Sequence, residues 1–257
     1  MDKFALSRKI KATMPVSKEL FIQDACQGKV VLDMGCIRYN ADFALHDPNW
    51  LHNKIKRVAK EVVGVDCLPA EIDKLNSQGY SIIYGDVTKS LDLHKIFDVI
   101  VAGDLIEHLL NFEGFFDNCS RLLKPDGIVI ITTPNPFYID EFYFVAIKKH
   151  YLINPEHTCW IDPQALSQLA IRFGYIIKEI SFIQASWKLS NLITESEKYQ
   201  YDILNGKWSD NSLKFKIFRK IGGIIFNIVY WPYKNLFSIN SDLVKYSDYL
   251  AVLKKRL

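Results

Sequence analysis

The stretch that decides the fold is residues 29–36, KVVLDMGC, in which an apolar run ends in an acid and a glycine. This pattern predicts a buried parallel strand with Asp33 and Gly35 at its carboxyl end. A second apolar run, residues 61–66 (EVVGVD), ends in Asp66. In open α/β sheets, ligands bind outside the carboxyl ends of the strands, and an acid that ends the second strand typically binds ribose hydroxyls. The two runs therefore indicate a site for an adenosine-containing cofactor.

The turn after the first strand narrows the choice of cofactor. A dinucleotide site needs Gly-x-Gly-x-x-Gly, whereas residues 37–39 of this chain are Ile, Arg and Tyr. Without a second or third glycine, the turn does not offer the close backbone approach that a pyrophosphate requires. A cofactor with an amino-acid tail and no phosphate fits better.

Size and composition indicate a globular protein with one large core. The chain has 257 residues, of which 49% are hydrophobic and 24% charged, and its formal net charge is +3. A charge this mild gives no indication of nucleic-acid binding, which usually draws on a concentrated basic face. The five cysteines include no Cys-x-x-Cys pair and the first residues lack a signal-peptide core, so we expect a cytoplasmic protein.

Apolar periodicity predicts alternating strands and helices. The β-branched run 128–132 suits a strand buried on both faces, and Asp162-Pro163 suits the start of a helix. Residues 124–127 (KPDG) are expected to form a turn. Strands are expected from residue 29 and at 61–65, 80–84, 97–102, 128–132, 175–183 and 249–253, and helices at 17–27, 50–60, 69–77, 112–123 and 162–174.

These elements predict an α/β fold with a doubly wound, mostly parallel, seven-stranded sheet of the Rossmann-like kind. An aromatic and basic segment interrupts the pairing of the sixth strand with the last, and we interpret it as a helical insertion that carries specificity. The predicted organisation is a core at residues 1–185, a helical cap at 186–242, and a last strand at 243–257 that returns to the core sheet.

The ordered motifs resemble those of class I S-adenosylmethionine-dependent methyltransferases, from residue 29 to residue 183 with the last strand added. Residues 32–36 (LDMGC) are similar to that family's first motif, and 64–66 (GVD) to its ribose-binding segment. Residues 106–109 (IEHL) are a further landmark. The similarity is greatest to the branch with quinone-precursor and sugar O-methyltransferases, and it is supported by residues 85–87, 97–100, 122–127 and 132–136.

The resemblance implies S-adenosylmethionine as the cofactor. Asp66 would bind the ribose hydroxyls, Asp86 would flank the adenine, and the backbone around Gly35 would face the methionine part. As a hypothesis, Arg38 binds the methionine carboxylate. The complete set of expected cofactor-binding residues is Asp33, Gly35, Cys36, Arg38, Asp66, Cys67, Asp86, Val87, Ala102 and Gly103.

Three residues are candidates for the chemistry of methyl transfer, which needs alignment of acceptor and methyl and removal of the acceptor proton. Glu107 and His108 follow the fourth strand, and His108 is the leading candidate for the base. His157 is a second candidate for proton removal or acceptor contact. In the alternative interpretation, Glu107 and His108 cap the next helix and orient the cofactor loop, and His157 is a loop residue bonded to backbone.

No metal site is predicted. A similar acidic and histidine cluster is associated with a divalent metal in the quinone-type relatives, but one Glu-His pair falls short of a ligand set. His157 and Cys159 also lack the partners of a zinc site.

The acceptor we favour is a hydroxyl of a sugar or glycan intermediate, since residues 50–52, residues 154–160 and the tail resemble methyltransferases of bacterial surface-polysaccharide assembly. The first alternative is a phenolic or quinone-like small molecule, favoured by a closed apolar pocket under Phe137, Tyr138 and Trp160. The second is a non-catalytic, methyltransferase-like scaffold in a membrane-associated complex, suggested by Ile37 and Tyr39 in place of glycine and by the basic cap.

The cap suggests contact with a membrane surface as one of two interpretations. Four basic residues accompany an apolar helical stripe, as in cationic amphipathic helices at anionic membranes. The other interpretation is a helix packed on the domain or on a second subunit. The oligomeric state is left open. The basic residues are Lys214, Lys216, Arg219 and Lys220.

Overall fold

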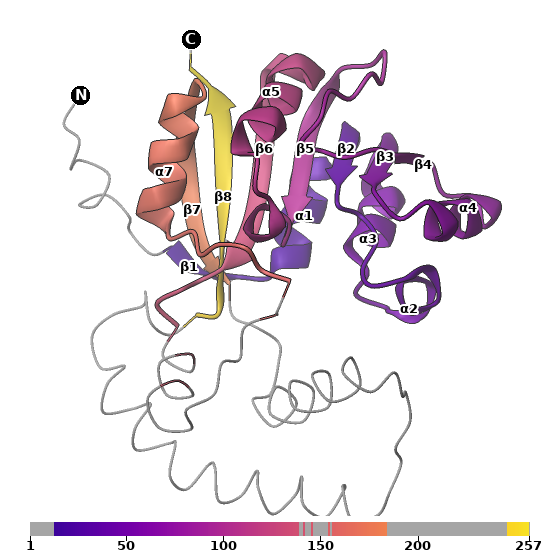
Figure 1. Cartoon of the computed structure of the whole chain (residues 1–257), viewed down its shortest axis with the longest axis horizontal. Helices are drawn as coiled ribbons and strands as arrows, with labels where there is room; N and C mark the ends of the chain where they lie inside the picture. Colours follow the sequence, from indigo (N-terminus) through magenta and orange to yellow (C-terminus); the bar gives the residue numbers. More distant parts are fainter. Residues whose placement is uncertain are drawn as a thin grey trace, which may run out of the picture.

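A computed structural model describes residues 13–138, 141, 145, 154, 156–183 and 246–256 of the chain. Within them, helices cover both faces of one sheet (Figure 1). The sheet order is β1-β7-β8-β6-β5-β2-β3-β4. The strands are β1 (Thr13–Val16), β2 (Val30–Met34), β3 (Glu61–Asp66), β4 (Ile82–Tyr84), β5 (Phe97–Gly103), β6 (Leu123–Pro134), β7 (Tyr175–Ile183) and β8 (Asp248–Lys255).

The strand directions match a doubly wound sheet. Strands β4, β3, β2, β5 and β6 are mutually parallel, and β8 is antiparallel to both β6 and β7. The predicted fold class is confirmed, with seven strands where the sequence predicts them. The sheet has an eighth strand that the sequence analysis missed, because β1 is a four-residue edge strand that pairs only with β7.

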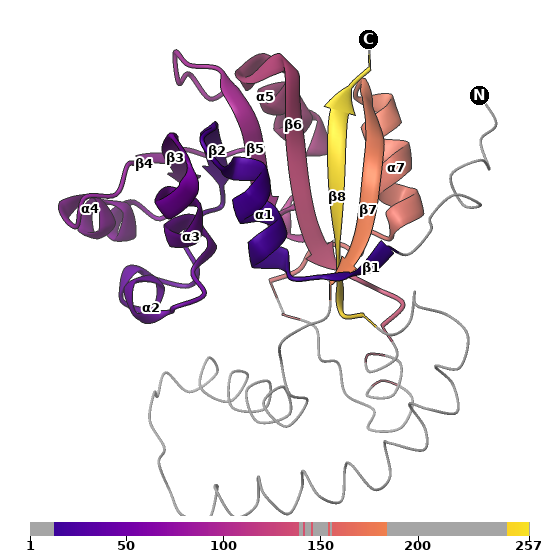
Figure 2. The same cartoon turned by 180° about the vertical axis from the view of Figure 1, so that it is seen from behind.

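Helices lie on the two faces of the sheet as the crossover connections require. One face is covered by α5 and α7, and the opposite face by α1 and α3 (Figures 1 and 2). The helices are α1 (Lys18–Cys26), α2 (Ala41–His46), α3 (Leu51–Val58), α4 (Pro69–Ser77), α5 (Phe112–Leu122) and α7 (Pro163–Arg172), with a 3-10 turn η1 (Ile106–His108).

Side-chain alternation along the central strands divides the core between the two faces. Val31 of β2 packs with α1 and α3, whereas its neighbour Leu32 packs with α5 and α7. On β5, Val99 and Ile100 divide in the same way. Because both faces of each strand are buried, these strands appear in the sequence as continuous apolar runs. This is why strands β2 and β5 could be predicted without any polar alternation.

Two local predictions need correction. Residues 124–127 are not a separate turn but lie within β6, where the pairing with β5 shifts register between Phe97 and Val99. The short helix α2 was not predicted, because it holds only six residues. It begins at the Asn40 cap, whose side chain accepts a hydrogen bond from the Phe43 amide at 2.8 Å.

The predicted cap at residues 186–242 lies outside the described residues, and so do its basic residues. Among the helices that the structure describes, none is both long enough and apolar enough to span a bilayer.

Gly114 of α5 provides a test of how the fold supports its loops. A Cβ atom at this position would lie 1.9 Å from the Thr88 carbonyl oxygen, which belongs to the loop after β4. We expect Gly114→Ala to destabilise the protein by about 1–3 kcal/mol through overpacking. Thermal denaturation measures this loss, and Asp117→Ala is the matched control, because its side chain is 65% exposed on the same helix. Equal melting temperatures for the two variants would contradict the packing.

Candidate active site

The expected cofactor residues meet at one edge of the sheet. The carboxyl ends of β4, β3, β2 and β5 follow one another along the lower edge in Figure 1. Asp86 follows β4, Asp66 ends β3, Gly35 follows β2 and Gly103 ends β5. The structure thus brings together the residues predicted to bind adenine (Asp86), ribose (Asp66) and the methionine part (Gly35), in that order along the edge.

Asp66 links the two loops that would contact the ribose. Its Oδ2 accepts a hydrogen bond from the Ile37 amide and its Oδ1 one from the Cys67 amide, each at 2.8 Å. Burial raises the pKa of Asp66, and the two amide bonds oppose that effect. A carboxylate has about four lone-pair sites, so both oxygens keep capacity for ligand hydroxyls.

The backbone at Gly35 is close to its neighbours. Gly35 has φ +70°, and a Cβ atom there would lie 2.7 Å from Cδ1 of Leu105. The Gly35 amide donates to the Val65 carbonyl at 2.8 Å, which ties the loop to β3. Glycine is therefore needed at this position for both its conformation and its size.

The two departures from the glycine pattern are accommodated differently. Ile37 is buried and packs into the core formed with α2 and α4. Tyr39 has φ +61°, so it adopts the left-handed conformation that a glycine would adopt freely. The loop therefore keeps a glycine-like backbone at Tyr39, at a cost of roughly 1–2 kcal/mol.

Arg38 and Cys36 face different surroundings. Arg38 Nη1 lies 2.9 Å from Asp47 Oδ2, and its guanidinium carbon lies 5.6 Å from the Tyr39 ring centroid. The proposed contact of Arg38 with the methionine carboxylate stays a prediction. Cys36 is buried, its carbonyl accepts a bond from Trp50 Nε1 at 2.7 Å, and burial raises the pKa of its thiol well above the usual range.

Asp33 has a buried partner that the sequence analysis did not identify. His52 Nδ1 lies 2.9 Å from Asp33 Oδ2, and both residues are buried. Such a pair offsets the cost of burying a carboxylate below the Gly35 loop. Nothing in the sequence signalled it, because the two residues come from β2 and α3.

The loop after β4 is closed by local hydrogen bonds. Asp86 Oδ1 accepts bonds from the Thr88 amide at 2.9 Å and from the Thr88 hydroxyl at 2.6 Å. These bonds hold the pKa of Asp86 below its usual range. Val87 is buried, and Asn118 of α5 donates to its carbonyl at 2.8 Å. The predicted adenine-side loop is thus anchored to the core.

The end of β5 holds a charged residue that the sequence analysis passed over. Asp104 directly follows Ala102 and Gly103, which were expected to bind the cofactor. This position next to them is the feature of the sequence that could have identified it. Ala102 is buried, and a Cβ atom on Gly103 would lie 2.9 Å from Leu51 Cδ2. Asp104 forms an ion pair with Lys18, the first residue of α1.

The predicted chemical residues form a compact cluster beside this edge. Glu107 is 1% exposed, and its Oε2 accepts a bond from the Thr133 hydroxyl at 2.8 Å. His157 Nε2 lies 4.0 Å from Glu107 Oε1, and the His157 and His108 rings meet edge-on with centroids 4.7 Å apart. His108 Nδ1 lies 3.2 Å from the Glu156 carbonyl oxygen. The structure therefore brings all three candidates together.

Two residues of the cluster have pKa values shifted in opposite directions. Burial, and secondarily the charge of Asp104, raises the pKa of Glu107 to about 8. Burial and the neighbouring His108 lower the pKa of His157 to about 4. At neutral pH, Glu107 is therefore mostly protonated while His157 is neutral. Opposite shifts of adjacent groups are typical of sites that move protons.

The structure corrects the capping interpretation of Glu107 and His108. Helix α5 begins at Phe112, and its cap is Asn111, whose side chain accepts a bond from the Gly114 amide at 3.1 Å. Glu107 and His108 lie in the separate turn η1. Instead of capping α5, Glu107 binds the Thr133 hydroxyl and His108 contacts the His157 ring.

Three ligand atoms in this cluster could hold a metal ion. One atom each from Glu107, His108 and His157 lie within 4.8 Å of one another. Among the described residues, Glu107 Oε1 is buried with no hydrogen-bond partner. His157 would thus be the third ligand that the Glu-His pair lacks in the sequence analysis.

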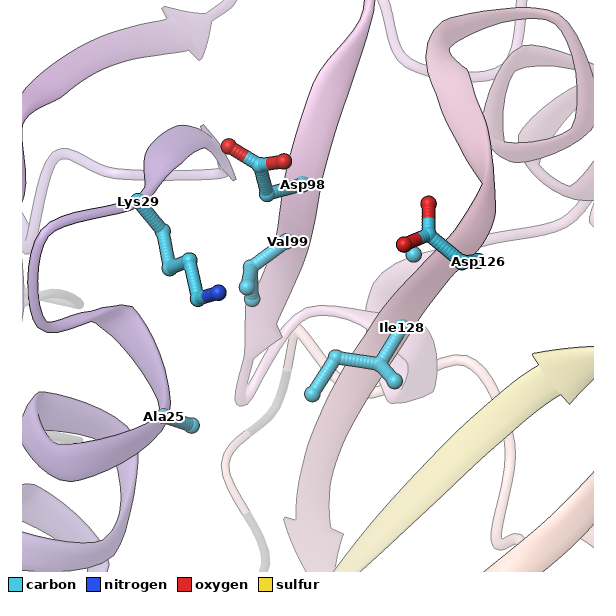
Figure 3. Close-up of a pocket in the computed structure, with 7 residues that line it drawn as sticks. Ala25, Lys29, Asp98, Val99, Asp126 and Ile128 are labelled. Carbon is cyan, nitrogen blue, oxygen red and sulfur yellow. The ribbon is translucent and has the colours of Figure 1, made fainter.

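Two expected aromatic groups are exposed, and a separate cavity lies elsewhere. Phe137 is 56% and Trp160 43% exposed. A cavity of about 160 Å³ between Lys29, Asp98 and Asp126 lies at the amino ends of the strands (Figure 3). It is far smaller than typical ligand pockets and lies at the end of the sheet opposite to the predicted site.

The raised pKa of Glu107 gives a prediction for stability. Between about pH 4.5 and pH 8, folded Glu107 keeps its proton while the unfolded chain releases it, so this residue makes the free energy of unfolding fall as pH rises. We expect Glu107→Gln to reduce that fall. The melting temperature of the variant minus that of wild type should therefore be a few degrees larger at pH 8 than at pH 5. Thermal melts at both pH values measure it, and a constant difference would contradict the shift.

Comparisons with known proteins identify the family. A family model described as a methyltransferase domain matches residues 18–179. A probable S-adenosylmethionine-dependent methyltransferase of Mycolicibacterium smegmatis is 26% identical over 157 residues, covering 60% of this chain and 54% of that protein. A ubiquinone biosynthesis O-methyltransferase of Rickettsia prowazekii is 27% identical over 146 residues, covering 51% of this chain and 58% of that protein. The chain therefore spans little more than half the length of these relatives.

Solved structures show the same fold. A methyltransferase from Archaeoglobus fulgidus covers 99% of this chain and all of its own, with 18% identity and a TM-score of 0.53. A putative methyltransferase from Bacillus halodurans covers 93% of this chain and 98% of its own, with 15% identity and a TM-score of 0.54. The family model covers more than half of the chain, so the resemblance noted in the sequence is confirmed and the protein belongs to the methyltransferase-domain family.

Proposed function

We propose that this protein transfers a methyl group from S-adenosylmethionine to a hydroxyl group of its acceptor. The observation that carries the proposal is the position of the Glu107, His108 and His157 cluster, next to the edge where the cofactor residues meet. The methyl donor would lie across the strand ends, with adenine at Asp86, ribose at Asp66 and the methionine part at Gly35. A methyl leaving towards β5 and β6 would then face the cluster.

His108 is the proposed general base. In the neutral ring, an Nδ1–H that donates to the Glu156 carbonyl leaves Nε2 without a proton, so Nε2 can accept the hydroxyl proton. His157, neutral at physiological pH, supports the ring of His108 by edge-on contact. In-line displacement on a sulfonium needs little else than this alignment and proton removal.

The same three residues have an alternative use as ligands of a divalent cation. The unpartnered Glu107 oxygen and the two imidazoles fit such an ion chemically. Bound there, the cation would polarise the acceptor hydroxyl and lower its pKa. Turnover measured with and without a chelator separates this use from that of a base.

For the acceptor, we propose a sugar or glycan intermediate of bacterial surface-polysaccharide assembly. Exposed Phe137 and Trp160 support this choice, since a sugar ring can pack its C–H face on an aromatic side chain while its hydroxyls stay hydrated. The second candidate is a phenolic or quinone-like molecule, and it is favoured by the ubiquinone O-methyltransferases among the relatives.

One experiment distinguishes these proposals. The purified chain is first titrated calorimetrically with S-adenosylmethionine and S-adenosylhomocysteine, and methyl transfer from labelled cofactor is then screened on sugar and phenolic acceptors. Binding with transfer to sugars alone supports the first acceptor, and transfer to phenols alone supports the second. Absence of cofactor binding would support the non-catalytic scaffold instead.

Asp66 tests the cofactor site. Asp66→Ala removes the acceptor of the Ile37 and Cys67 amides as well as the proposed ribose contacts, so we expect binding of S-adenosylhomocysteine to be lost in calorimetry. Asp66→Asn, which keeps one acceptor oxygen, should bind more weakly than wild type by roughly tenfold or more. The control is Asp73→Ala, because Asp73 is an exposed acid of α4. Wild-type affinity in the alanine variant would refute the ribose assignment.

His108 tests the chemistry. We expect His108→Ala to lower kcat by roughly 10²–10⁴-fold while the affinity for S-adenosylhomocysteine stays unchanged, because the base acts only on the acceptor proton. His94→Asn is the control, since His94 is exposed and its φ of +45° is tolerated by asparagine. Normal turnover in His108→Ala would remove His108 as the base.

A further inference from the structure

Lys18 occupies a position that local helix energetics disfavour. It is the first residue of α1, where the positive end of the helix dipole repels a cation. Its side chain is only 21% exposed and forms an ion pair with Asp104, which lies 86 residues further along the chain. A residue that breaks a local rule in this way is compensated by tertiary structure, and such residues concentrate at functional sites.

Asp104 is held from several directions. Its backbone is left-handed, with φ +51°, and its amide donates to both the carbonyl and the hydroxyl oxygen of Thr132 at 3.0 Å. The Thr132 hydroxyl donates to Asp104 Oδ1 at 2.7 Å, and Lys18 binds Oδ2. Each oxygen therefore keeps a lone pair, and the side chain is still 45% exposed.

The position of Asp104 relative to the cofactor edge is defined by β2 and β5. These strands pair in register, with Met34 opposite Ala102, and Gly35 leaves no room for a Cβ against Leu105. The loop expected to face the methionine part thus touches the residue next to Asp104. Neighbouring strands lie about 4.8 Å apart and β2 lies between β3 and β5, so Asp104 follows the second strand along the edge from the ribose end at β3, just beyond the Gly35 loop.

The charges around Asp104 are mixed. Lys18 and Arg38 act on it as cations, while Asp248 and Glu107 are the neighbouring acids. Desolvation raises the pKa of Asp104, but the charge and hydrogen bond of Lys18, with the Thr132 hydroxyl and Arg38, outweigh that effect and hold the pKa below its usual range. Asp104 is therefore a fixed carboxylate, and Arg38 adds a cation close by.

We propose that Asp104 binds the α-ammonium group of the cofactor's methionine tail and that Lys18 is a positioning residue that fixes the Asp104 carboxylate for this contact. A zwitterionic tail presents an ammonium and a carboxylate on one carbon, and Asp104 with Arg38 offers the complementary pair of charges. The assignment rests on the proposed use of S-adenosylmethionine and adds to it the group that recognises the amino-acid end.

Two ligands that differ only at that end provide the test. S-adenosylhomocysteine carries the amino-acid tail, whereas 5′-methylthioadenosine has the same adenosine and thioether without it. Calorimetry on the full chain should show that Asp104→Asn weakens binding of S-adenosylhomocysteine roughly ten- to hundredfold and leaves binding of 5′-methylthioadenosine unchanged. Asparagine is chosen because it tolerates the left-handed backbone.

Lys18 variants test the positioning role while Asp104 stays in place. Lys18→Met should weaken binding of S-adenosylhomocysteine several-fold with no effect on 5′-methylthioadenosine, and Lys18→Arg should restore most of it. An equal loss for both ligands in either Asp104→Asn or Lys18→Met would show a merely structural role and overturn the assignment, as would wild-type affinities in Asp104→Asn. If wild type binds neither ligand, the proposed cofactor itself fails, which is a distinct result.

Discussion

The parallel pairing of β2 with β3 on one side and β5 on the other is the constraint on which the site depends. Because the three strands run in one direction, their carboxyl ends stop at the same edge, and each ends in or next to an acid. Asp33, Asp66 and Asp104 reach this edge from β2, β3 and β5, and Glu107 follows in η1. The sheet therefore concentrates negative charge where a cationic cofactor would bind.

Each of these acids is stabilised in a different way, since like charges this close cannot all remain ionised without partners. Asp33 has the buried imidazole of His52, Asp66 has two backbone amides, and Asp104 has the ammonium of Lys18. Glu107, with no cation at bonding distance among the described residues, keeps its proton to a pKa of about 8. These differences agree with the separate structural, ligand-binding and proton-handling roles proposed for these four acids.

Most of the fold could be predicted because the signals were local. Helix α4 begins and ends at the predicted residues, and α7 begins with the predicted Asp162 cap and Pro163. The elements that were missed lacked such signals: β1 exists through its pairing with β7, and α2 is too short for a periodicity. The KPDG segment was misassigned because a turn composition can also occupy a register shift inside a strand.

By itself, the sequence determined the order of strands and helices, the acids at the strand ends, and the three residues of the candidate chemical cluster, because these follow from periodicity and from motifs contiguous in the chain. Only the tertiary structure decided which groups face them. His52, Lys18 and Thr133 come from other elements, and His157 joins Glu107 and His108 from 49 residues or more away. The pKa of a carboxyl group depends on burial and on charges within a few ångströms, and neither quantity is local in the sequence.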